Sequence, residues 1–137
     1  MILIDTGPLV ALCDRRDRLH RTALKDLDRV AGDPLATCLP VLTEACFHLQ
    51  SRPARGRLRR LLEELGVRSL EIDDESVAYS DVFDWLDRYA EHSPDWTDGY
   101  LSGLTGRDRR LRVWTYDREF RTTWRRPDGS PIPLVAG

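Results

Sequence analysis

Apolar and polar positions divide the chain into two kinds of segment. Some are short apolar runs bounded by turn-forming residues, and others place apolar residues three or four positions apart over longer stretches. The first kind predicts buried strands, and the second predicts helices with one buried face. We expect strands at residues 1–4, 35–39, 67–72, 111–117 and 132–135.

Helices are expected in the segments between these strands, at about residues 8–13, 19–30, 41–50, 58–65, 73–89 and 100–104, the fifth of them with acids at its N-terminus. Because strands and helices alternate, the pattern predicts a single α/β domain over residues 1–137. Its central sheet should be mostly parallel, with about five strands, and flanked by helices. In the fifth of these helices, the side chains expected to be buried in the core are Tyr79, Val82, Phe83, Leu86 and Tyr89.

The composition is that of a globular protein, with 137 residues, 41% hydrophobic and 32% charged. No apolar run approaches the roughly 20 residues of a membrane span. Because the sequence begins directly with a strand, we expect no secretory signal peptide and a cytoplasmic protein. Cys13, Cys38 and Cys46 lie in apolar settings without C-x-x-C spacing, so neither a disulfide framework nor a zinc site is expected.

Charge is unevenly distributed, although the net charge is only −2. Residues 52–60 carry five arginines and no acid, residues 71–98 carry ten acids against Arg88 alone, and residues 107–126 carry eight arginines against three acids. Such segregation fits an acidic site flanked by basic surfaces that hold a polyanion, or else ordinary solvated helix faces.

Acidic residues stand where predicted strands end or helices begin. Asp5 directly follows the first strand and Asp117 ends the fourth, whereas Glu44, Asp95 and Asp98 lie near helix starts. Taken alone, Glu44 is typical of a helix-start residue, and one of the aspartates at 95 and 98 is expected to be an N-cap. Because parallel strands end at one edge of a sheet, we expect the acids to meet there.

Several carboxylates in one pocket repel one another, and they stay ionised when cations neutralise them. Oxygen-only ligands favour Mg²⁺ or Mn²⁺, which bind substrate phosphates as well. The chemistry expected of such a pocket is metal-assisted phosphodiester hydrolysis, in which the metal lowers the pKa of a bound water.

Four stretches together resemble the signature blocks of the PIN-domain ribonucleases. They are LIDTGPLVAL within residues 2–12, LTEA at 42–45, DWTDGYL at 95–101 and TYDREF at 115–120. Within that family the chain is most similar to the toxin half of bacterial VapBC toxin–antitoxin pairs. It departs from the family at Gly99-Tyr100, where an alanine usually follows the third acid, and this change is expected to loosen the start of that helix.

The resemblance implies a Mg²⁺-dependent endoribonuclease toxin, with Mn²⁺ as a possible substitute metal. Its catalytic acids would be Asp5, Glu44, Asp98 and Asp117, with Asp95 as a fifth metal ligand. Thr6 and Thr115 would orient water or carboxylates around them. The implied partners are an RNA substrate, a second copy of the chain in a homodimer, and a small antitoxin protein. We expect the antitoxin to dock along residues 19–27 and 47–65 and to place an arginine among Asp5, Glu44 and Asp98.

Other classes of protein also place acids at strand ends. A receiver-type phosphotransfer domain needs a lysine late in the sheet, and the sole lysine is Lys25, in an early helix. A haloacid-type phosphatase needs a second aspartate two residues after the first, where this chain has Gly7. The remaining alternative is a catalytically inactive PIN-like module that binds RNA or protein. Retention of all four acids weighs against it.

Overall fold

A parallel sheet forms the centre of the computed structural model, which describes residues 1–73 and 75–135, with backbone only for residues 75–78. In this part of the chain the sheet has four strands in the order β3-β2-β1-β4, and every neighbouring pair is parallel. The strands are β1 (Ile2–Ile4), β2 (Leu35–Cys38), β3 (Arg68–Leu70) and β4 (Arg112–Trp114). The predicted α/β architecture is confirmed.

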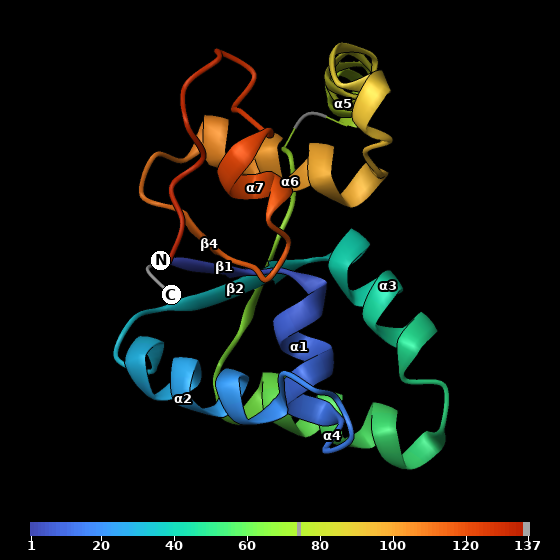
Figure 1. Cartoon of the computed structure of the whole chain (residues 1–137), viewed down its shortest axis with the longest axis vertical. Helices are drawn as coiled ribbons and strands as arrows, with labels where there is room; N and C mark the ends of the chain where they lie inside the picture. Colours follow the sequence, from blue (N-terminus) through green and yellow to red (C-terminus); the bar gives the residue numbers. More distant parts are fainter. Residues whose placement is uncertain (74, 136–137) are drawn as a thin grey trace.

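Helices cover the sheet on both sides. They are α1 (Thr6–Cys13), α2 (His20–Val30), α3 (Leu39–His48), α4 (Arg52–Glu64), α5 (Glu75–Arg88), α6 (Trp96–Arg107) and α7 (Glu119–Thr122), with a 3-10 turn at Ala90–His92. Figure 1 shows α1, α2 and α4 on one side of the sheet and α5, α6 and α7 on the other. Among the described residues, no helix combines the length and the apolar character needed to cross a membrane.

The first strand lies at the centre of the core. Ile2, Leu3 and Ile4 are fully buried, since β1 has neighbouring strands on both edges and helices on both faces. Burying each of these side chains contributes about 1.5–3 kcal/mol relative to exposure. The position of Asp5 is therefore set by the most buried strand of the protein.

The sheet has one strand fewer than the approximately five expected. Residues 132–135 make only an isolated bridge, in which Leu134 pairs with Val113. The Val113 N–H donates to the Pro133 carbonyl over 2.8 Å, and the Val135 N–H donates to the Val113 carbonyl over 2.9 Å. Pro131 and Pro133 have no N–H to donate, so a regular strand is not sustained there.

The buried face expected for α5 is partly wrong. Val82 is buried, but Tyr79 and Phe83 are 58% and 55% exposed. The core position is taken by Trp85, which is 2% exposed and donates its indole N–H to the Arg125 carbonyl over 2.8 Å. Trp85 lies three residues after Val82, so the buried stripe runs through 82 and 85 and turns Tyr79 and Phe83 toward solvent.

Candidate active site

All five acids singled out from the sequence line one cleft of about 440 Å³ beside the carboxyl ends of the strands. These acids are Asp5, Glu44, Asp95, Asp98 and Asp117. They come from four segments that are far apart in the chain, since Asp95 and Asp98 share one segment. Asp5 follows β1 and Asp117 lies just beyond β4, while α3 follows β2 and carries Glu44. The parallel sheet brings these segments to one edge, as ligand sites of open α/β sheets require.

Asp5 is the most tightly held of these acids and is only 9% exposed. One carboxylate oxygen accepts from the Thr6 backbone N–H over 2.7 Å, and the other accepts from the Thr115 hydroxyl over 2.8 Å. Burial, together with the smaller effect of the charges of Glu44 and Asp117, raises the pKa of Asp5 to about 6 against the lowering effect of these two hydrogen bonds. Asp5 is thus fixed in place, and its ionised form is disfavoured.

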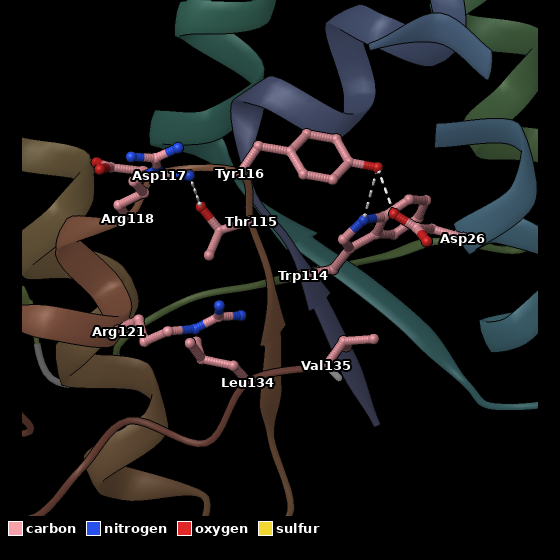
Figure 2. Close-up of a pocket in the computed structure, with 9 residues that line it drawn as sticks. All are labelled: Asp26, Trp114, Thr115, Tyr116, Asp117, Arg118, Arg121, Leu134 and Val135. Atoms are coloured by element: carbon pink, nitrogen blue, oxygen red, sulfur yellow. Dashed lines mark hydrogen bonds between the residues drawn. The ribbon is translucent and has the colours of Figure 1, made fainter. Parts of the chain in front are cut away.

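Thr115 connects two of the acids. Besides donating to Asp5, its hydroxyl accepts from the Asp117 backbone N–H over 3.0 Å, the contact drawn in Figure 2. The Asp117 carboxylate in turn accepts from the Glu119 N–H over 2.9 Å and so leads the chain into α7. The ends of β1 and β4 are therefore joined by one side chain.

Glu44 reaches the cleft from a helix that starts earlier than expected. The sequence placed this helix at 41–50 with Glu44 in its first turn, but α3 begins at Leu39 because Pro40 fits its first turn. Glu44 therefore lies in the second turn, where its carboxylate accepts a long hydrogen bond of 3.4 Å from the Thr6 hydroxyl.

Asp95 and Asp98 form a reciprocal cap at the start of α6. Asp95 is the N-cap and accepts from the Asp98 N–H over 2.9 Å, while Asp98 accepts from the Asp95 N–H over 3.1 Å. Burial, and then the negative charge of Asp95, raise the pKa of Asp98 well above its usual range, although the hydrogen bond from the Asp95 N–H lowers it. The two acids stabilise a helix end at the same time as they line the cleft.

Gly99 does not loosen the start of α6, contrary to expectation. A Cβ at this position would lie 3.0 Å from Val82 Cγ1 and 3.1 Å from Trp85 Cε3. The glycine therefore allows α6 to pack closely against α5, and the cap formed by Asp95 and Asp98 secures the first turn. An alanine at this position would press on both Val82 and Trp85.

Three further polar residues of the cleft were missed from the sequence: Asp17, Arg18 and His48. His48 lies four residues after Glu44, so the helical spacing of α3 could have revealed it. Asp17 and Arg18 come from the loop between α1 and α2, where no sequence signal marks them.

The donors fit a hard divalent cation by their chemistry. Six carboxylates line the cleft, Asp17 and the five singled out from the sequence, and burial and mutual repulsion raise the pKa of Asp5 and of Asp98, which a cation among them would relieve. Within residues 1–73 and 75–135, however, no three His, Cys, Asp or Glu side chains already converge as ligands. Binding would require carboxylates to turn toward a common point, and Asp98 has one oxygen available for this, since the Asp95 N–H bonds to the other.

Comparison with known proteins supports the same architecture. A crystal structure of VapC20 from Mycobacterium tuberculosis, described as a toxin that cleaves the sarcin–ricin loop, aligns with a TM-score of 0.69 and 22% identity. The alignment covers 89% of this chain and 94% of that one. None of the curated proteins matches significantly in sequence. The sequence model of the PIN domain matches residues 2–124, which is most of the chain, and this protein therefore belongs to the PIN domain family.

Proposed function

We propose that this protein is a Mg²⁺-dependent endoribonuclease that acts in the cytoplasm as the toxin of a toxin–antitoxin pair. The observation that carries the proposal is the cleft itself, in which five acids from four separate segments meet beside the ends of parallel strands. Membership of the PIN domain family and the likeness of the fold to a VapC toxin support the same activity.

The residues of the cleft have distinct tasks in this proposal. Asp5, Glu44, Asp98 and Asp117 hold the cation, with Asp95 as a fifth ligand. When bound, Mg²⁺ or Mn²⁺ supplies a water of lowered pKa and neutralises charge on the phosphate. Thr115 keeps the carboxylates of Asp5 and Asp117 in a fixed relation, because it hydrogen bonds to both residues.

The experiment is RNA cleavage by the purified protein with and without divalent metal. We expect cutting with Mg²⁺ or Mn²⁺, none in excess chelator, and none by Asp5→Asn in any metal. Asp28→Asn is a matched control because Asp28 is exposed on α2 and does not line the cleft. Full activity in chelator would refute the mechanism. An absence of cutting under every condition would favour the binding module, for which the unconverged carboxylates are the supporting observation.

We further propose that a small antitoxin protein and a second copy of the chain cover apolar surface. Exposed large hydrophobic residues lie at the start of α3, on α5 and at the start of α6: Leu39, Tyr79, Phe83 and Trp96. The rings of Phe83 and Trp96 pack edge to face with centroids 5.1 Å apart, so they form one surface. We assign this surface to the homodimer, since apolar patches of this kind mark protein interfaces.

For the antitoxin, the expected stretches at 19–27 and 47–65 offer Leu24 and Phe47 as large exposed hydrophobic residues, at 45% and 71% exposure. An arginine of the partner would pair with the carboxylates of the cleft and exclude the metal. Co-expression with an antitoxin, sought as a small protein encoded beside this gene, should rescue growth and give an inactive complex. Harmless expression of the chain alone, with no such protein, would refute the toxin role while leaving the ribonuclease intact.

A further inference from the structure

A second pocket, of about 190 Å³, adjoins the acidic cleft at the end of β4 and shares Asp117 with it. Its rim carries Arg118 and Arg121, and its wall is formed largely by Trp114, Tyr116, Leu134 and Val135. Figure 2 shows the extended Arg121 side chain beside Leu134. Cationic and apolar groups therefore meet directly beside a proposed metal ligand.

The two arginines of this pocket differ from the four arginines that precede them in the same basic segment. Arg107, Arg109, Arg110 and Arg112 each pair with an aspartate. Arg118 and Arg121 are exposed, and neither has a carboxylate partner among the residues that the structure describes. They are three residues apart and so project from the same side of the α7 turn. Two guanidinium groups are thus free to bind an anion.

The polar groups in the largely apolar wall of the pocket already have hydrogen-bond partners. The buried Trp114 indole N–H donates to the Tyr116 hydroxyl over 3.3 Å, and that hydroxyl donates to Asp26 over 2.7 Å. Leu134 and Val135 are half-buried and add aliphatic surface. Such a wall suits a ring that is held by van der Waals contact, because the polar groups of the wall need no hydrogen bond from a ligand.

We propose that this pocket binds the nucleotide adjacent to the phosphate that is cut, with its phosphate on Arg118 and Arg121 and its ribose or base against Leu134 and Val135. The assignment rests on the proposed ribonuclease function. Guanidinium groups bind phosphate through paired N–H donors. The pocket, at about 190 Å³, is smaller than the roughly 300–1,000 Å³ of sites that enclose drug-sized ligands, so it has room for the sugar or the base of one nucleotide while the phosphate stays at the rim.

Charge balance supports a nucleic acid at this position. The cleft beside the pocket is lined by carboxylates, which repel the phosphates of an approaching RNA. Arg118 is the residue immediately after Asp117, so its charge counters that repulsion next to the acids themselves. Phosphate contacts position a strand without reading its sequence, and this pocket is accordingly assigned to positioning.

The test measures binding of a short labelled single-stranded RNA by fluorescence anisotropy across a range of salt concentrations, with every variant carrying Asp5→Asn so that cutting does not interfere. Removing one phosphate contact on a single strand lowers the slope of log K against log salt by about 0.7. Arg118→Ala with Arg121→Ala should therefore lower it by about 0.7, because the two arginines hold the same phosphate, with a roughly tenfold loss of affinity per arginine at low salt.

The matched control is Arg109→Ala with Arg110→Ala, which removes the same charge from the same segment but takes it from arginines that already pair with Asp128 and Asp108. Its slope should stay unchanged. Arg118→Lys with Arg121→Lys should restore most of the slope, because the positive charge returns. Thermal melting of each variant establishes that the fold is retained.

Two results would overturn the assignment. Equal slopes for the pocket pair and the control pair would show that the arginines contact no phosphate. Unchanged RNA binding with a weakened complex with the co-expressed antitoxin would make the pocket a protein contact. Because binding is read without cutting, the ribonuclease proposal fails separately, by an absence of metal-dependent cleavage in the otherwise unmodified chain.

Discussion

The cleft holds its carboxylates in two different ways. Asp5 and Asp117 are anchored to the ends of neighbouring strands, and the Thr115 hydroxyl bonds to both residues. Asp95 and Asp98 instead bond to each other's backbone and close the first turn of α6. The anchored pair depends on the sheet for its position, whereas the capping pair depends on the first turn of α6. The two halves therefore differ in which part of the fold sets the position of their carboxylates.

The largest expected effect concerns stability against pH in the absence of metal. The pKa of Asp5 is raised from 3.8 to about 6, so between these values the unfolded chain releases a proton that the folded chain keeps. The contribution of Asp5 to the free energy of unfolding should therefore be highest below pH 4. It should fall as the pH rises and level off above about pH 6. The loss is at most about 3 kcal/mol. Asp98, whose pKa is also raised, extends the fall to higher pH.

Denaturant unfolding at a series of pH values checks this prediction. Asp5→Asn should flatten the fall relative to the parent chain, and added Mg²⁺ should restore stability at pH 8 by binding only the folded state. A parent and a variant with parallel pH profiles would mean that Asp5 ionises in the fold as easily as in the unfolded chain.

The next effect separates Asp98 from its capping partner. Asp98→Asn removes a proposed metal ligand and should lower RNA cleavage about a hundredfold, from the loss of several kcal/mol of charge stabilisation. At pH 8 and without metal the same variant should unfold at higher denaturant, because a disfavoured buried charge is gone. Retained cleavage would assign Asp98 to the helix cap alone.

Thr115→Val tests the anchored pair. Valine keeps the shape but removes both hydrogen bonds, so the pKa of Asp5 should rise further, since the bond from Thr115 lowers it. Cleavage at neutral pH should fall about tenfold and partly recover at higher pH, where Asp5 regains its charge. A uniform loss at every pH would show that Thr115 acts on position and not on ionisation.

The smallest effect compares two substitutions at the N-cap of α6. Asparagine caps a helix about as well as aspartate, so Asp95→Asn should change stability by only a few tenths of a kcal/mol, whereas Asp95→Ala should cost about 1 kcal/mol. Thermal melting distinguishes them. If Asp95→Asn nevertheless lowers cleavage, Asp95 contributes charge to the cleft beyond its capping role.

Much of the fold and of the cleft could be predicted because the signals are local. An apolar run followed by an aspartate predicts both the burial of β1 and the position of Asp5. The parallel topology then brings the other acids to the same edge of the sheet. The exposed face of α5 could not be read in the same way, because Tyr79 and Phe83 compete with Trp85 for burial and only the packing against α6 decides between them.

Ion pairs between side chains could not be predicted from the sequence either. The basic segment at 107–126 was recognised as a whole, but nothing in it distinguishes Arg109, which pairs with Asp128, from Arg121, which has no carboxylate partner among the described residues. That distinction depends on how the turn at 127–130 folds back, and it is what separates a solvated arginine from one available to a substrate.

The hydrogen bond from Thr115 to Asp5 joins residues that are 110 positions apart, between the first strand and the last strand of the sheet. Contacts of such long range form late, since the entropy of closing the intervening loop must be overcome first. A ribosome that has synthesised residues 1–114 holds a chain that lacks both Thr115 and Asp117. The acidic cleft is therefore absent through most of translation, so a partner translated at the same time can be waiting when the last carboxylate arrives.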